Sequence, residues 1–210
     1  MNRPGYLEQI KHTIDQAEPG TVFLASDFAD VVDNKTVHMS LVRLTEQGKL
    51  QKIMRGLYMK PRYSKLLGEN VPGRPDDLAR AIARNYGWNI CPSDMAALNI
   101  AGLSTQVPSV WEYISDGPYK TYDYDNSRII FRHTNRNTEL TSVSEKSALI
   151  IRALKALGKE NISEETIRIL SDKLCKEDKK ILLEESKYST SWIYEVIRQI
   201  CKEQENVSDS

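Results

Sequence analysis

The chain has 210 residues, enough for one large domain or two small ones, and its 40% apolar and 28% charged residues are ordinary for a globular protein. Its 29 Lys and Arg residues equal its 29 Asp and Glu residues, so the total charge indicates neither a nucleic acid nor a membrane surface as partner. No apolar run approaches the roughly 18 residues of a membrane span, and the N-terminus lacks the apolar core of a secretory signal, so we expect a cytoplasmic protein that does not enter a membrane.

The first third of the sequence predicts a small domain of helices and short strands. Apolar spacing and turn residues give the elements in this order: a helix over residues 6–16, a strand over 21–24, a helix over 27–32 capped by Ser26, a helix over 35–47, and strands over 49–54 and 57–60. The helix over 35–47 begins after Asp33-Asn34 and ends at Gly48, as helices with a C′ glycine do. Arg55-Gly56 joins the two strands that follow.

The helix over residues 35–47 has two unlike faces. Val37, Leu41 and Leu44 fall on one face, and we expect them to bury against Leu7, Ile10, Ile14 and Phe28. The opposite face carries Lys35, Thr36, Met39 and Arg43, with His38 and Ser40 at its flanks. A helix that enters a major groove needs this division, because one face must be anchored in a core while the other presents hydrogen-bond donors and short side chains to base edges.

Positive charge is concentrated on this helix and the strands after it. Residues 35–68 contain eight Lys and Arg and one acid, Glu46, a net charge of +7. Residues 1–34 contain two Lys and Arg and six acids, a net charge of −4. A basic block on an amphipathic helix is typical of a nucleic-acid-binding surface.

Together these features predict a winged helix-turn-helix that binds double-stranded operator DNA. The side chains expected at the interface are Lys35, Thr36, Met39, Ser40, Arg43, Lys49, Lys52 and Arg55, with Lys60 also on the wing. The lysines and Arg55 would hold phosphates, Thr36, Met39 and Ser40 would approach bases, and Arg43 would do either. The same pattern also fits a solvated charged face, or a winged helix that docks onto a protein and has no specific DNA target.

The sequence beyond residue 68 predicts a mixed sheet followed by helices. Residues 62–77 are expected to form a linker, and the elements after it are a helix over 76–86, a short helix from Ser93 to Gly102, strands over 110–115, 119–124 and 127–133, and helices over 144–157, 163–174, 176–186 and 190–203. The predicted fold is therefore α+β with two domains. A winged helix-turn-helix spans residues 1–68, and a mixed sheet packed by helices, with a helical C-terminal extension, spans residues 69–210.

Three groups of side chains in the second domain have alternative interpretations. The aromatic group on the strands is either covered by helices or a stacking surface for single-stranded nucleic acid: Trp111, Tyr113, Tyr119, Tyr122 and Tyr124. The stripe on the last helix is either core or a dimer face, which leaves both a monomer and a homodimer open: Trp192, Ile193, Val196, Ile197 and Ile200. Arg128, Arg132 and Arg136 either extend the DNA footprint or lie on a solvated edge.

No motif predicts catalysis, a metal site or a cofactor. Cys91, Cys175 and Cys201 are widely spaced without a CxxC, which is typical of free thiols in a reducing cytosol. The histidines His12, His38 and His133 show no metal-binding spacing, and no phosphate-binding glycine loop occurs. A nucleophile and base formed by Cys91 and His133 would have no catalytic signature around it. We therefore expect a protein that is not an enzyme and binds no cofactor.

Two stretches resemble a known family, the AbiEi-type antitoxins of type IV toxin–antitoxin systems. LVRLTEQGKLQKIMRGLY at residues 41–58 is similar to the family's N-terminal winged helix, and SDMAALNIAGLSTQVPSVWEYISDGP at 93–118, followed by SRIIFRH at 127–133, is similar to its second domain. The resemblance covers about residues 5–158, while residues 159–210 match only in being helical. It implies a repressor of its own operon and an antitoxin against a nucleotidyltransferase-like toxin encoded beside it, which it need not bind stably.

Overall fold

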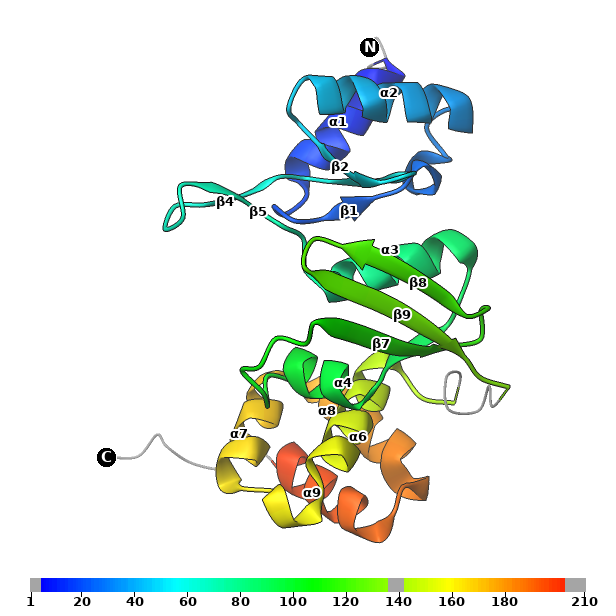
Figure 1. The fold of residues 1–210 in the computed structure, drawn as a ribbon. Coiled ribbons are helices and arrows are strands. Elements are labelled where there is room, and N and C mark those ends of the chain that lie inside the picture. Colours follow the sequence, from blue (N-terminus) through cyan, green and yellow to red (C-terminus); the bar gives the residue numbers. More distant parts are fainter. Residues whose placement is uncertain (1–4, 136–141, 203–210) are drawn as a thin grey trace. The chain divides into compact units, whose positions relative to one another are not determined.

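The fold is α+β, as predicted, and falls into two compact units (Figure 1). The computed structural model describes residues 5–135 and 142–202, and the units are Met1–Trp88 and Asn89–Ser210. The division follows Trp88 and not residue 68, because the helix expected to open the second domain belongs to the first. Its Arg84 donates hydrogen bonds to Val22 O at 3.3 Å and to Asp27 Oδ2 at 3.0 Å.

The first unit places two helices over a small antiparallel sheet. Its elements are α1 Tyr6–Gln16, β1 Val22–Phe23, the 3₁₀ helix η1 Ala25–Phe28, α2 Asn34–Glu46, β2 Gln51–Met54, β3 Leu57–Met59, β4 Arg62–Ser64, β5 Glu69–Val71 and α3 Pro75–Tyr86. Strands β1, β3 and β2 pair in that order, and β4 pairs with β5 as a separate hairpin. Figure 1 shows α1 and α2 on one face of the three-stranded sheet.

The apolar face of α2 is buried as expected. Val37, Leu41 and Leu44 are at most 1% exposed and belong to one core with Ile10 and Ile14 of α1. Burying an aliphatic side chain of this size contributes about 1.5–3 kcal/mol, so this face fixes α2 against α1. Each end of α2 lies one residue earlier than predicted: Asp33 caps its start, and Gly48, with φ of 71°, follows the C-cap Gln47 in the left-handed conformation.

Two predictions for the first unit are wrong. The helix expected over residues 27–32 is a 3₁₀ turn over Ala25–Phe28, because the Asp27 carboxylate accepts from Leu24 N at 2.8 Å and starts the turn before Ser26. The expected linker over 62–77 contains the β4–β5 hairpin and the first three residues of α3. The linker was predicted from Gly68, Pro72, Gly73 and Pro75, and these turn residues border the short strands and the start of α3.

The second unit is a mixed four-stranded sheet with helices. Its elements are β6 Ile90–Pro92, α4 Asp94–Ala101, β7 Val110–Ser115, β8 Lys120–Tyr124, β9 Ser127–His133, α6 Glu145–Leu157, η2 Lys159–Asn161, α7 Glu164–Asp172, α8 Lys176–Glu185, η3 Ser186–Tyr188 and α9 Ser191–Cys201. The strand order is β6-β7-β9-β8, with β7 and β9 parallel and the other neighbours antiparallel. The mixed sheet was predicted, but β6 was not.

The C-terminal helices form a core and not an extension. Leu170 of α7, Leu182 of α8 and Ile197 of α9 are at most 1% exposed and pack in one cluster with buried residues of α4 and α6. The stripe on α9 is therefore core within this unit. On the sheet, Trp111 and Tyr113 are buried, so neither presents a ring face on which a base can stack. In the part of the chain that the structure describes, no helix is both long and apolar enough to cross a membrane.

Candidate nucleic-acid interface

The exposed face of α2 carries two cations and a methionine on successive turns. Lys35, Met39 and Arg43 are exposed, Met39 at 66%, and their spacing of four residues places them along one face of the helix. Within residues 5–135 and 142–202, neither Lys35 nor Arg43 makes an ion pair. This face can therefore present a neutral, flexible side chain between two uncommitted positive charges.

Thr36 and Ser40 are less available than the sequence suggests. The Thr36 hydroxyl donates to Asp33 Oδ2 at 2.7 Å, and its backbone N–H donates to Asp33 Oδ1 at 3.1 Å. These hydrogen bonds hold the pKa of the Asp33 carboxyl below its usual 3.8. Ser40 is 4% exposed, and its hydroxyl donates to Thr36 O at 2.8 Å. Of the side chains predicted to approach bases, Met39 and Arg43 are thus the exposed ones.

The hairpin after α2 carries two exposed cations near its turn. Lys52 lies on β2 opposite Tyr58 of β3, and Arg55 lies in the turn beside Gly56. Gly56 has φ of 82°, a left-handed conformation that glycine adopts without strain, so the turn can be tight. In the described residues, Lys52 and Arg55 make no ion pair. Both side chains are exposed and near the turn, and their contact with phosphate stays a prediction.

Lys49 and Lys60 contact residues at the C-terminal end of α1. Lys49 Nζ lies 3.5 Å from Asp15 Oδ1, and Lys60 Nζ donates to Asp15 O at 2.8 Å and to Ala17 O at 2.7 Å. The last turn of α1 has no basic residue of its own, so Lys60 satisfies carbonyls that the helix end leaves without partners. Both lysines therefore contact the end of α1, and Lys60, predicted on the wing, directly follows the end of β3 at Met59.

A shallow hollow lies between α1 and the exposed face of α2. Its volume is about 640 Å³, and it is lined by Tyr6, Leu7, Thr36, His38, Met39, Ser40, Val42, Arg43 and Glu46. Tyr6 and Val42 are 48% and 44% exposed. Sequence reasoning missed both, because Tyr6 precedes the first periodic apolar residue and Val42 neighbours the buried Leu41. The hollow adds an apolar component to the charged face.

The basic residues of β9 are paired with acids. Arg128 Nε lies 2.8 Å from Asp123 Oδ1, and Arg132 Nε lies 2.7 Å from Glu112 Oε1. Arg136 lies outside the described residues. Because each paired guanidinium already has a carboxylate partner, Arg128 and Arg132 offer no unpaired charge that would extend a DNA footprint.

In the described part of the second unit, the ring of His133 is engaged by nearby groups. Its Nδ1 lies 2.9 Å from Gly117 O and its Nε2 lies 2.8 Å from Asn135 Oδ1, so both ring nitrogens have partners other than Cys91. The hydrogen bond with Gly117 O raises the pKa of His133. Among the described residues, no group of three or more His, Cys, Asp and Glu side chains is arranged to hold a metal ion.

Comparisons with known proteins give a family but no activity. The model of a family of unknown function, DUF6088, matches residues 9–182. No curated protein matches the chain. Among solved structures, the chain is similar to the RV2827C protein from Mycobacterium tuberculosis, with 11% identity and a TM-score of 0.40 over 95% of this chain and 77% of that one.

Proposed function

The chain belongs to the DUF6088 family, and we propose that its first unit is a winged helix-turn-helix that binds double-stranded DNA and represses transcription. One observation carries the proposal. Four cations, Lys35 and Arg43 on α2 and Lys52 and Arg55 on the following hairpin, are exposed and make no ion pair in the part of the chain that the structure describes. Such charges release counterions when they meet phosphates, which gives affinity for DNA.

The order of elements in the first unit supports this assignment. Helix α1, strand β1, the short η1, helix α2 and the β2–β3 hairpin follow one another, and β1 completes the sheet beside β3. In this arrangement α2 acts as the recognition helix and the β2–β3 hairpin acts as the wing. The buried Val37, Leu41 and Leu44 face anchors α2, so its opposite face can enter a major groove.

The contacts divide into those that read sequence and those that do not. Arg43 donates to a guanine edge, a contact that discriminates by about 1–3 kcal/mol, or to a phosphate. Met39 packs against a thymine methyl group or a sugar. Lys35, Lys52 and Arg55 hold the backbone on either side and contribute affinity without sequence information.

We extend the proposal to autoregulation and to an antitoxin role. The resemblance of residues 5–158 to AbiEi-type antitoxins supports both roles, because it runs through the winged helix and into the second unit. In that role the protein represses its own operon and opposes a nucleotidyltransferase-like toxin. A reading frame for such a toxin beside this gene is the observation that would bear most directly on the antitoxin role.

The wing is tested by removing its two cations. The double variant Lys52→Ala/Arg55→Ala should bind a duplex from the protein's own upstream region more weakly than the wild type, because two phosphate contacts are lost. The plot of log K against log salt concentration should flatten by about 2, at roughly 0.9 per phosphate. Fluorescence anisotropy of a labelled duplex across a salt series measures both quantities.

Lys155→Ala/Arg168→Ala is the matched control for this experiment. It removes the same charge from exposed positions on α6 and α7 of the second unit. The control should bind with wild-type affinity and slope. If the wing variant also binds with wild-type affinity and slope, the β2–β3 hairpin is not a DNA contact.

A second candidate function is docking of a protein on the same face. The hollow with exposed Tyr6, Met39 and Val42 favours it, because exposed apolar side chains gathered at a hollow mark many protein interfaces. An apolar interface would not weaken steeply with salt, whereas a phosphate interface would. Binding partners captured on this face and insensitive to salt would favour the docking function.

A further inference from the structure

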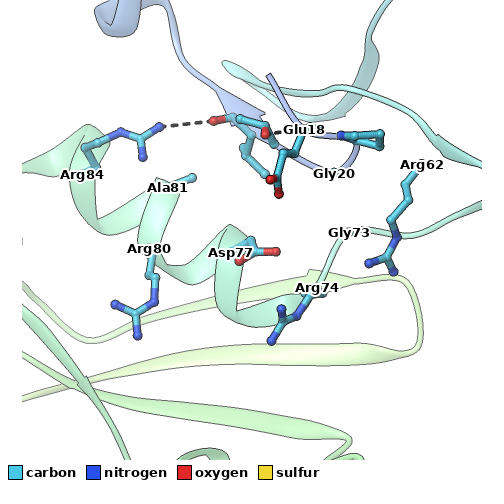
Figure 2. Close-up of a pocket in the computed structure, with 12 residues that line it drawn as sticks. Glu18, Gly20, Arg62, Gly73, Arg74, Asp77, Arg80, Ala81 and Arg84 are labelled. Carbon is cyan, nitrogen blue, oxygen red and sulfur yellow. Dashed lines mark hydrogen bonds between the residues drawn. The ribbon is translucent and has the colours of Figure 1, made fainter. Parts of the chain in front are cut away.

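A second hollow lies within the first unit, where the loop before β1, the start of β4 and helix α3 meet (Figure 2). Its volume is about 440 Å³, within the range of small-ligand sites. Four arginines, Arg62, Arg74, Arg80 and Arg84, line it together with two acids, Glu18 and Asp77. Four guanidinium groups around one hollow are a strong local concentration of planar cationic donors.

Two of the four arginines already have carboxylate partners. Arg80 Nε donates to Asp76 Oδ2 at 3.0 Å, and an Arg84 terminal nitrogen donates to Asp27 Oδ2 at 3.0 Å. Neither Asp76 nor Asp27 lines the hollow. Arg84 also donates to Val22 O at 3.3 Å, and Val22 lines the hollow. Arg80 and Arg84 are therefore already engaged, and they contribute positive charge at fixed positions more than free hydrogen-bond donors.

Arg62 and Arg74 are the uncommitted pair. In residues 5–135 and 142–202, neither guanidinium group makes a hydrogen bond or an ion pair. Figure 2 shows the two side chains on either side of Gly73, Arg62 from the start of β4 and Arg74 from the residue before α3. Two guanidinium groups placed in this way have their full set of N–H donors available for an oxyanion.

Asp77 is the acid on which three of the four arginines act electrostatically. Burial raises the pKa of the Asp77 carboxyl, against the opposing charges of Arg74, Arg80 and Arg62. The carboxyl makes no hydrogen bond among the described residues. The positive charges of these three arginines thus act on the half-buried Asp77 carboxylate, although none of the three donates a hydrogen bond to it. Glu18 is exposed, so water and salt screen its charge more strongly.

We propose that this hollow binds a phosphate group, with Arg62 and Arg74 as the donors. Guanidinium groups bind phosphate oxygens through paired, charge-assisted hydrogen bonds, which lysine cannot reproduce. Arg80 and Arg84 supply additional positive potential, and Asp77 weakens binding because it lies beside the ligand with a like charge. The phosphate comes either from a DNA backbone, which rests on the proposed function, or from a free phosphate-bearing ligand, which does not.

Titration of the full chain with inorganic phosphate tests the site. Isothermal titration calorimetry of the wild type should give a dissociation constant below about 10 mM, and Arg62→Gln/Arg74→Gln should weaken binding at least tenfold. Asp77→Asn should tighten it, by roughly fivefold, because a neighbouring negative charge is removed. Absence of binding to the wild type, or equal binding by the arginine variant, would overturn the proposal.

Two further variants show whether weaker phosphate binding comes from the loss of guanidinium contacts or from unfolding of the protein. Arg62→Lys/Arg74→Lys keeps both charges but not the forked donors, and should bind phosphate more weakly than the wild type and more tightly than the Gln variant. Arg168→Gln, on α7 of the second unit, should bind phosphate as the wild type does. Asp77→Asn is expected to bind phosphate more tightly than the wild type, and unfolding of a variant could not produce that gain. The expected order of affinity is Asp77→Asn, wild type, Arg62→Lys/Arg74→Lys and Arg62→Gln/Arg74→Gln, and a different order would count against the site.

Measuring DNA binding by the same variants shows whether the bound phosphate belongs to a DNA backbone or to a free phosphate compound. If Arg62→Gln/Arg74→Gln loses phosphate binding and its salt slope for DNA falls by about 2, the site holds the DNA backbone. If phosphate binding is lost and DNA binding is unchanged, the ligand is a free phosphate compound. Phosphate binding by a wild type that does not bind DNA would reject the proposed function and leave this site standing.

Discussion

At the scale of single residues, Asp33 decides how α2 begins. Its carboxylate accepts from Thr36 N and from the Thr36 hydroxyl, so it satisfies a backbone donor at the helix start and also fixes the orientation of Thr36. Aspartate at this position suits the positive end of the helix dipole as well. Asp33 therefore stabilises the start of α2.

Asp33→Ala should lower the midpoint of thermal unfolding by roughly 2–4 °C at neutral pH. The hydrogen bonds from Thr36 hold the folded-state pKa of Asp33 below 3.8. Its charge therefore stabilises the fold above that pH, and this contribution is lost as pH falls through the folded-state value. The difference in midpoint between wild type and variant should shrink below about pH 4. Circular dichroism melts at several pH values measure it.

Asp33→Asn is the control, because the amide oxygen can still cap the helix but carries no charge. Its midpoint at neutral pH should lie between those of the wild type and Asp33→Ala. A difference between wild type and Asp33→Ala that stays constant from pH 7 to pH 3 would contradict an ionised cap.

The interface shows how far residues can be predicted from one sequence. The uncommitted charges of Lys35, Arg43, Lys52 and Arg55 follow from composition and helical spacing. The engagement of Lys49 with Asp15 does not, because it depends on where α1 ends in space. Ser40 was placed at the flank of the polar face, and only the packed core shows that this flank is buried.

At the scale of elements, α9 belongs to the core of the second unit. Ile193, Ile197 and Ile200 are at most 1% exposed, while Tyr188, just before the helix, is 98% exposed. Apolar spacing predicted the stripe, but a single chain's pattern is the same for a core and for a dimer face. The burial of the stripe within one chain resolves the alternative.

Ile197→Ala should lower the free energy of unfolding by about 2–5 kcal/mol, because a fully buried side chain leaves a cavity. Tyr188→Ala, a larger deletion at an exposed position, should change it by less than about 0.5 kcal/mol. Urea denaturation measures both, and size-exclusion chromatography should show the wild-type oligomeric state for each. An Ile197→Ala variant of unchanged stability and altered oligomeric state would identify α9 as a dimer face.

Element lengths explain which parts of the fold the sequence predicts. The longer elements α2, β7, β9 and α6 were predicted within one residue of their ends, because each shows several repeats of its period between clear caps or turns. The short β4, β5 and β6 were missed. The arginines of the second hollow could not be grouped from sequence, because β4, the turn before α3 and α3 itself bring them together only in the fold.

At the scale of the whole molecule, the net charge is zero although basic residues are concentrated in one part of the chain. The +7 block over residues 35–68 separates in the structure into three roles. Lys49 and Lys60 contact the end of α1, Arg62 lines the second hollow, and the cations of α2 and the β2–β3 hairpin are exposed, as is Lys65. The association with DNA that we propose would depend on this local distribution and not on the total, since salt screens charges beyond about 8–10 Å.

The most direct test of DNA binding is the salt dependence of the wild-type protein on its own upstream duplex, compared with a scrambled duplex of equal length. If Lys35, Arg43, Lys52 and Arg55 each meet a phosphate, log K should fall with log salt concentration with a slope of about −3 to −4. The upstream duplex should also bind more tightly than the scrambled one at every salt concentration. A slope near zero, or equal affinity for the two duplexes, would contradict a sequence-specific winged-helix repressor.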